Sequence, residues 1–243
     1  NSMSDTTAHT GALAGRGALI TGASRGVGAA VAKRFAAEGA HVILLARTVG
    51  GLEEIDDAIK TAGGQATLVP CDLTEFEAID TLGPALLERF DKLDILVGNA
   101  GALGEMTPLT HYDAKAWHEV FDVNVHANWR LIRTLDPLLR RSDAGRAIMV
   151  TSGAASNPRA FWGAYAVTKA ALETLVHVWA SELADTNVRV NLLNPGATRT
   201  GMRAAAFPGE DPETLKTPED ITGTFVELAS AECTRHGDLI DLA

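Results

Sequence analysis

The stretch TGASRGVG, Thr21 to Gly28, decides the fold. It lies between a run typical of a strand, GALITG (17 to 22), and a run with the period of a helix, 26 to 38. Three glycines at a strand-to-helix junction indicate a backbone that comes close to something. In open α/β sheets, ligands bind outside the carboxyl ends of the strands, where a helix N-terminus offers free N–H groups. The junction therefore predicts a ligand site at the start of the first helix.

Outward from this junction, short apolar runs alternate with longer segments of helical period. We expect strands at 17–22, 41–47, 66–73, 93–101, 147–153, 188–196 and 238–242. We expect helices at 26–38, 50–62, 75–90, 113–141, 164–185 and 218–230. Several of the strands are almost entirely apolar, as strands covered on both faces should be. The pattern predicts an α/β fold of Rossmann type, a doubly wound parallel sheet of about seven strands with helices on both faces.

The organisation along the chain indicates one domain at 15–243. Residues 1–14 are expected to form a flexible N-terminal tail, in which Asn1 and Ser2 before Met3 are typical of a cloning scar. One long irregular segment, 197–218, contains three prolines and little periodicity. Loops of this length are often functional, so we expect it to form a lid over the substrate.

Composition excludes several classes of function. The net charge of −10, with no run of basic residues, argues against nucleic-acid binding. The two cysteines, Cys71 and Cys233, belong to no disulfide framework or metal-ligand cluster, and the seven histidines show no metal spacing. The first dozen residues lack the apolar core expected of a signal peptide, and no apolar stretch reaches the roughly 18 residues of a membrane span. We therefore expect a protein of the cytoplasm that binds no metal and no membrane.

The glycine spacing and two arginines predict the ligand. Gly22, Gly26 and Gly28 form GxxxGxG, which is neither the P-loop nor the strict GxGxxG fingerprint, and a tight turn without ligand is an alternative. After the second strand, an acidic residue would hold a free ribose hydroxyl, whereas a 2′-phosphate needs arginine. This chain has Arg47 there and Arg25 in the turn, which favours NADP(H) over NAD(H). The alternative is that both are solvated surface arginines.

Further along the chain, YAVTK places Tyr165 and Lys169 four residues apart, on one face at the start of a helix. Upstream, VTSG places Ser152 at the carboxyl end of a strand, near where that helix begins. The Tyr165–Lys169 pair and Ser152 are each common by themselves, but their combination with the glycine turn is a specific signal.

With these motifs the chain resembles the short-chain dehydrogenase/reductase family, from about residue 15 to its end. The matching elements are the TGxxxGxG turn, NAG at Asn99 to Gly101, the PG motif in NPGATRT, and a catalytic tetrad of Asn124, Ser152, Tyr165 and Lys169. The segment TRTGMRAAAFPGEDPETLKTPEDI (198–221) further resembles a bacterial subgroup without an assigned substrate.

The resemblance implies roles for individual residues. Lys169 would contact the nicotinamide ribose, and Asn124 would hold a water that links the lysine to solvent. The implied cofactor-binding residues are Gly22, Ser24, Arg25, Gly26, Val27, Gly28, Arg47, Asp72, Leu73, Asn99, Ala100, Gly101, Tyr165, Lys169, Pro195, Gly196, Thr198 and Thr200. For Asp72, the alternative is an N-cap before the next helix. The family also implies a homodimer through helices 113–141 and 164–185, or a homotetramer.

Elementary chemistry supports the tetrad independently. A carbonyl that accepts hydride develops negative charge on oxygen, so it needs an acid and a hydrogen-bond donor. Tyr165 is the expected acid and Ser152 the donor. An ammonium about 4 Å from the phenol is worth about 4 kcal/mol at an effective dielectric near 20, or roughly three pKa units. We therefore expect Lys169 to supply most of the lowering of the pKa of Tyr165.

Two more positions belong to the predicted site. Trp117, Phe121, Asn128 and Leu131 share one helical stripe with Asn124, so Asn124 is expected to face inward, and a satisfied core asparagine without catalytic work is the alternative. Trp162 precedes Tyr165 by three residues and either lines the substrate pocket or belongs to the core.

The leading hypothesis is an NADP(H)-dependent oxidoreductase that moves hydride between the cofactor and a carbonyl or secondary alcohol of a small, partly apolar substrate. The alternative is a non-catalytic NADP(H)-binding sensor or scaffold of the same fold, and the four tetrad residues argue against it. A nucleotide-sugar epimerase or dehydratase is disfavoured, because the region after residue 200 is short.

Overall fold

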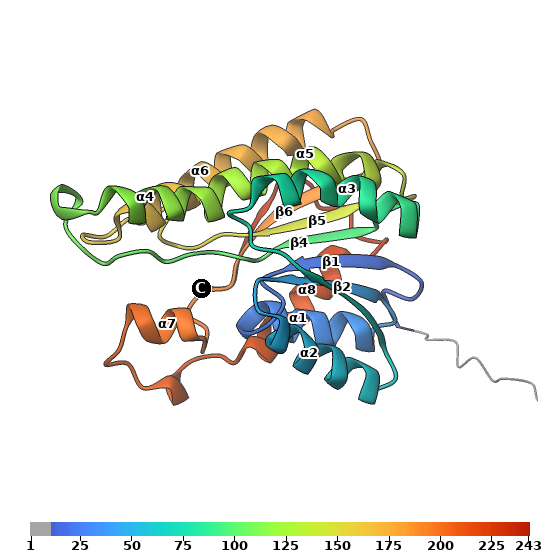
Figure 1. The fold of residues 1–243 in the computed structure, drawn as a ribbon, viewed down its shortest axis with the longest axis horizontal. Helices are drawn as coiled ribbons and strands as arrows, with labels where there is room; N and C mark the ends of the chain where they lie inside the picture. Colours follow the sequence, from blue (N-terminus) through green and yellow to red (C-terminus); the bar gives the residue numbers. More distant parts are fainter. Residues whose placement is uncertain (1–10) are drawn as a thin grey trace, which may run out of the picture.

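A computed structural model describes residues 11–243 and has at its centre one parallel sheet of seven strands (Figure 1). The strands are β1 (Gly17–Thr21), β2 (His41–Ala46), β3 (Gln65–Pro70), β4 (Ile95–Gly98), β5 (Arg146–Val150), β6 (Arg189–Asn194) and β7 (Leu239–Asp241). Their spatial order is β3-β2-β1-β4-β5-β6-β7, and every pair is parallel. The predicted doubly wound sheet of seven strands is confirmed.

Helices cover both faces of the sheet (Figure 1). One layer holds α1 (Gly26–Ala37), α2 (Val49–Thr61) and α8 (Thr222–Ala229). The other holds α3 (Phe76–Phe90), α4 (Ala114–Phe121), α5 (Ala127–Arg140) and α6 (Gly163–Glu182). Each layer has its own apolar core, with Phe35 and Phe225 fully buried in the first and Leu131 and Leu172 in the second. The almost entirely apolar strands follow from this, because their side chains are buried on both faces.

The ordered domain begins earlier than expected. Leu13 is fully buried in the core of the α1 layer, and its backbone N–H donates to the carbonyl oxygen of Glu38 at 3.0 Å. Leu13, within the tail expected over 1–14, therefore packs in the core of the domain. The remaining part of the expected tail, with the cloning scar expected at Asn1 and Ser2, lies outside the described residues.

The single helix expected at 113–141 is interrupted. Between α4 and α5 the chain forms one turn of π-helix, η2 (Asp122–His126). Such wide turns are rare and occur often at functional sites. The π-turn contains Asn124, so the position of the Asn124 side chain depends on this local change of helical pitch.

The segment 197–218 is more regular than the sequence indicated. It contains the short helix α7 (Gly201–Ala206) and the 3-10 turn η3 (Pro212–Thr214), and it ends where η4 (Pro218–Ile221) leads into α8. An isolated β-bridge between Thr198 and Lys216 closes its base. Figure 1 shows α7 apart from both helical layers. We call residues 197–218 the lid segment.

The sheet order reverses between β1 and β4, which are direct neighbours. The chain leaves β1 toward one layer and β4 toward the other, so their carboxyl ends open a crevice. Ligands of open α/β sheets bind at such a switch point. The remaining 3-10 turn, η1 (Leu109–His111), lies in the long connection after β4.

Candidate active site

In the glycine turn after β1, backbone atoms pack so closely that only glycine fits at some positions. Gly22 and Gly26 have φ values of +64° and +56°, in the left-handed region that favours glycine. A Cβ on Gly28 would lie 2.1 Å from the carbonyl oxygen of Gly22, so no larger residue fits there. α1 begins in this turn with no side-chain cap and no acidic residue in its first turn. The first N–H groups of α1 are therefore suited to an anionic group.

Thr21 and Asn99 hold this turn against the end of β4. The hydroxyl oxygen of Thr21 accepts hydrogen bonds from the backbone N–H groups of Asn99 and Ala100, both at 3.0 Å. The side-chain amide of Asn99 donates to the carbonyl oxygens of Thr21 and Gly22 at 3.2 and 3.4 Å. Asn99 thus braces the glycine turn. Thr21 is a structural residue that sequence reasoning missed, although a hydroxyl at the end of a central strand was the available signal.

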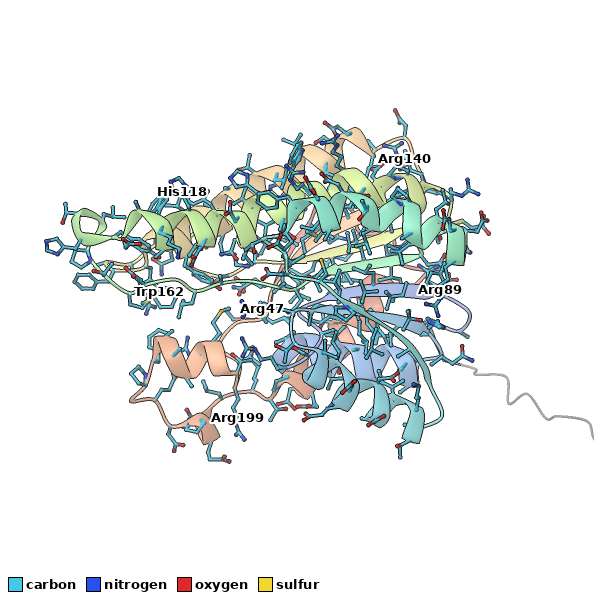
Figure 2. The ribbon with its side chains drawn as sticks, in the orientation of Figure 1. Arg47, Arg89, His118, Arg140, Trp162 and Arg199 are labelled. Atoms are coloured by element: carbon cyan, nitrogen blue, oxygen red, sulfur yellow. The ribbon has the colours of Figure 1, made fainter. Side chains whose placement is uncertain are left out.

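Arg25 in the glycine turn and Arg47 directly after β2 both have exposed side chains. Figure 2 shows Arg47 at the carboxyl end of the sheet, far from Arg89 at the opposite end. The pKa of Asp72 is lowered by the backbone N–H and hydroxyl of Thr74, which donate to its Oδ1 at 2.9 and 2.8 Å, and further by the charge of Arg47. Glu75, and not Asp72, is the N-cap of α3, so the N-cap alternative for Asp72 is wrong.

A second turn follows β6 at the same edge of the sheet. Gly196 has a φ of +68°, and its N–H donates to Oδ1 of Asn194 at 3.1 Å. The buried hydroxyl of Thr198 donates to the carbonyl oxygens of Pro195 and Gly196 at 3.4 and 3.3 Å. Nζ of Lys216 donates to the carbonyl oxygen of Pro195 at 3.1 Å. Lys216 thereby ties the far end of the lid segment to this turn.

Thr200 connects the lid segment to the glycine turn. Its hydroxyl oxygen accepts from the N–H of Arg203 at 3.1 Å and so caps α7, while its methyl carbon lies 3.5 Å from the place of a Cβ on Gly26. Beside this contact is a cavity of about 430 Å³ between α1 and the base of the lid segment. It is lined by Gly26, Ala29, Ala30, Lys33, Arg199, Thr200, Gly201, Pro218 and Glu219.

Lys169 is buried at the carboxyl end of β5. Its Nζ donates to the carbonyl oxygen of Val150 at 3.0 Å and lies 5.7 Å from the ring centre of Tyr165. Burial lowers the pKa of Lys169 to about 8, and the negative charge of Glu173 acts in the opposite direction. A Cβ on Gly101 would lie 3.5 Å from both Nζ of Lys169 and Oδ1 of Asn124, so both side chains lie beside the predicted NAG element.

Asn124 is completely buried, as its helical stripe predicted. Its Oδ1 accepts from the N–H of Ala102 at 2.8 Å, and its Nδ2 donates to the carbonyl oxygen of Ala102 at 2.9 Å and the hydroxyl of Thr168 at 3.0 Å. Its own carbonyl oxygen accepts from Nδ2 of Asn128 at 2.8 Å. Asn124 therefore fixes the loop after β4 to α6, which sequence reasoning did not foresee.

The electrostatics of Tyr165 differ from expectation. Burial raises the pKa of Tyr165, and a hydrogen bond with Ser152 acts in the opposite direction. Lys169, which was expected to supply most of the lowering of this pKa, donates through Nζ to Val150 and lies 5.7 Å from the centre of the phenol ring. Ser152 is itself oriented by the N–H of Ala154, which donates to its Oγ at 3.2 Å.

Aromatic side chains connect Tyr165 to the lid segment. The ring of Trp162 lies 5.8 Å from that of Tyr165 and 5.6 Å from that of Phe207, between centroids. Figure 2 shows Trp162 between the α4 region and α7. The guanidinium of Arg203 lies over Phe207 at 3.8 Å and pairs with Glu210 through two bonds of 2.7 and 2.8 Å. Trp162 thus lies between Tyr165 and the lid segment.

The other predicted residues gather at the same edge of the sheet. Ser24 and Val27 follow β1 in the glycine turn, and Leu73, after β3, is buried. Within residues 11–243, no cluster of three histidine, cysteine or carboxylate side chains is placed to hold a metal ion, and no helix is long and apolar enough to cross a membrane.

Known proteins share this architecture. The family model for short chain dehydrogenases matches residues 16–211. The uncharacterized oxidoreductase YciK of Escherichia coli (strain K12) is 40% identical over 220 residues, which cover 89% of this chain and 87% of that protein. A short chain dehydrogenase structure from Pseudomonas syringae is 40% identical, with a TM-score of 0.92 and 99% of each chain covered.

A structure from Shigella flexneri 2a str. 301, a short chain dehydrogenase complexed with NADP, has a TM-score of 0.92 and 38% identity over 96% of this chain and 98% of that chain. The family match, the identities and the shared fold agree with the order of motifs along the sheet edge. This protein therefore belongs to the short-chain dehydrogenase family of oxidoreductases.

Proposed function

We propose that the protein is an NADP(H)-dependent oxidoreductase that transfers hydride between nicotinamide and a carbonyl or secondary alcohol, with Tyr165 as general acid and base. One observation carries the proposal. The buried ammonium of Lys169 lies 5.7 Å from the ring centre of the buried Tyr165, at the carboxyl end of the sheet, where α1 also begins without a side-chain cap. A charge is costly to bury, so its retention beside a phenol indicates proton chemistry.

The residues at the sheet edge fit NADP(H). The N–H groups at the start of α1 suit a pyrophosphate, and Gly22, Gly26 and Gly28 leave room for it. The exposed guanidinium groups of Arg25 and Arg47 suit a 2′-phosphate, through charge-assisted bonds worth roughly 1.5 to 3 kcal/mol each. The similar structure complexed with NADP supports the same assignment. When bound, the cofactor would supply or accept the hydride.

Tyr165 would give its proton to the oxygen of a carbonyl as negative charge develops there. Burial raises its pKa, so it is protonated at neutral pH, as an acid for reduction must be. Ser152 would donate a hydrogen bond to the same oxygen, and the charge of Lys169 would stabilise the phenolate that remains. The bonds of Asn124 to Ala102 and Thr168 would keep the wall of the site in register with α6.

The substrate is proposed to be small and partly apolar. Trp162 and Phe207 present aromatic rings on the lid side of Tyr165. The guanidinium of Arg203, which is stacked on Phe207, is paired with Glu210. This surface favours an uncharged substrate body next to the reacting carbonyl.

We also propose a homo-oligomer, at least a dimer, as the working form. The outer faces of α5 and α6 carry the apolar side chains of Trp129, Val167 and Val178, which are 44%, 45% and 52% exposed. Apolar surface of this kind favours association. Sedimentation at several concentrations tests it, and a monomer at all of them contradicts it. A location in the cytoplasm stays a prediction.

The test of function compares Tyr165→Phe with the unchanged protein on a panel of ketones, aldehydes and quinones, by the decrease of NADPH absorbance. We expect turnover to fall about 10³-fold while NADPH affinity stays within a factor of two or so, because the phenol acts as an acid. Tyr112→Phe, at the other tyrosine of the chain, is the control and should retain turnover. Tight NADPH binding without turnover of any panel member would favour the sensor or scaffold.

A further inference from the structure

Lys169 has no carboxylate as a direct partner. The ion pairs found within residues 11–243 do not include it, although its side chain is 4% exposed. Its one hydrogen bond is to the carbonyl oxygen of Val150. A buried ammonium bound only to a neutral carbonyl loses its proton easily, because burial disfavours the charged form. The site therefore needs another source of negative potential to keep Lys169 charged.

Glu173 lies one helical turn after Lys169, on the same face of α6. It is half-buried, and its Oε1 accepts a hydrogen bond of 2.7 Å from the hydroxyl of Thr151. Thr151 directly follows Val150 and is itself buried. The carboxylate of Glu173 and the ammonium of Lys169 are thus attached to consecutive residues of one strand end.

We propose that Glu173 is a positioning residue for the active site: held by Thr151, it supplies the negative charge that keeps Lys169 protonated and directed toward Val150. This inference rests on the proposed function for its consequence in catalysis, because a charged Lys169 is what the phenolate of Tyr165 requires. The claim that Glu173 keeps Lys169 charged does not depend on the proposed function, because it rests on the contacts of Glu173.

The surroundings of Lys169 leave this role to Glu173. The elements packed around Nζ contribute Gly101, Asn124, Val150 and Thr151, none of which is charged. Tyr165 is the other titratable group there, and burial raises its pKa, so it is neutral at pH 7. α4 and η2 also pack on α6. The charged residues of α4, Lys115, His118 and Glu119, are exposed, and η2 carries the half-buried Asp122 and the exposed His126. The charge that acts on the pKa of Lys169 is that of Glu173.

The decisive experiment is the titration of Lys169 in the unchanged protein and in Glu173→Gln, by NMR of lysine labelled with ¹³C at Cε. The chain has six lysines, and Lys169→Met identifies the signal. Glutamine keeps an oxygen that accepts from Thr151, so the variant removes charge and preserves shape. We expect the pKa of Lys169 to fall by at least roughly half a unit in Glu173→Gln. An unchanged pKa would overturn the proposal.

The controls separate charge from structure. Glu182 is an exposed carboxylate near the end of the same helix, and Glu182→Gln should leave the titration of Lys169 unchanged. Glu173→Asp keeps the negative charge, so the pKa of Lys169 should stay close to its value in the unchanged protein. An equal fall in Glu182→Gln would also overturn the proposal, since it would show a general effect of charge.

The catalytic consequence is measured as the pH profile of kcat/KM for NADPH oxidation. In Glu173→Gln the alkaline limb should move to lower pH by the same amount as the Lys169 titration, with little change at pH 6. If the pKa of Lys169 falls in Glu173→Gln while the alkaline limb of the kcat/KM profile stays in place, the proposal that Glu173 positions Lys169 for catalysis is wrong. If the unchanged protein turns over no substrate, the proposed function fails instead, and the NMR titration still decides the role of Glu173.

Discussion

The Nζ of Lys169 donates a 3.0 Å hydrogen bond to the carbonyl oxygen of Val150, the last residue of β5. This bond brings a helix side chain to the end of a central strand, beside Gly101. The resulting burial disfavours the ammonium, and the pKa of Lys169 is about 8. The free energy of unfolding therefore depends on pH through the titration of Lys169.

The first prediction follows from the sign of this linkage. The pKa of Lys169 falls from 10.5 to about 8 on folding, so between these pH values the unfolded chain binds more protons. The free energy of unfolding should thus gain roughly 3 kcal/mol from this group as pH rises from about 8 to 10.5. Lys169→Met should lack this gain. Denaturant titrations of both proteins at several pH values test it, and parallel pH curves would contradict it.

The second prediction concerns cofactor choice. Arg47→Ala should weaken NADPH binding by about 10- to 100-fold and leave NADH binding nearly unchanged, because only NADPH has the 2′-phosphate that a guanidinium holds. Arg89→Ala, at the far end of α3 in Figure 2, is the matched control. Calorimetric titration with both cofactors measures the effect. Equal losses for NADPH and NADH would mean that Arg47 does not recognise the 2′-phosphate.

The third prediction tests the glycine turn. Gly28→Ala places a Cβ 2.1 Å from the carbonyl oxygen of Gly22 and 2.6 Å from the amide nitrogen of Asn99, so the turn must open. We expect a loss of about 2 kcal/mol or more in the free energy of unfolding, as for other overpacked sites. Gly223→Ala, at an exposed helical position with open space around it, should instead gain about 0.5 to 1 kcal/mol. Thermal unfolding of both variants decides; similar Tm values would refute the steric argument.

The fourth prediction concerns the lid segment. Phe207→Ala removes the ring that lies 5.6 Å from Trp162, and with it the apolar contact that we propose for the substrate body. KM for the substrate should rise about tenfold with little change in kcat, since this contact is equal in ground and transition states. Leu87→Ala, an exposed apolar residue on α3, is the control. A fall in kcat at constant KM would show that Phe207 acts on the chemical step instead.

The motif residues could be foreseen because their signals are local. The spacing of Gly22, Gly26 and Gly28 depends only on the turn that they form, and Tyr165 and Lys169 share a face because a helix repeats every 3.6 residues. The roles of Asn99 and Asn124 could not be foreseen, because their amide groups bond to segments that lie far away in the sequence.

By itself, the sequence determined the parallel sheet with two helical layers, the family, and the residues that meet at the carboxyl ends of the strands. Periodicity and turn chemistry express these features within short windows of the chain. Only the tertiary structure decided that Leu13 joins the core, that a π-turn carries Asn124, and that Nζ of Lys169 donates to Val150. Burial and pKa values depend on which distant segments pack together, and no local pattern records that packing.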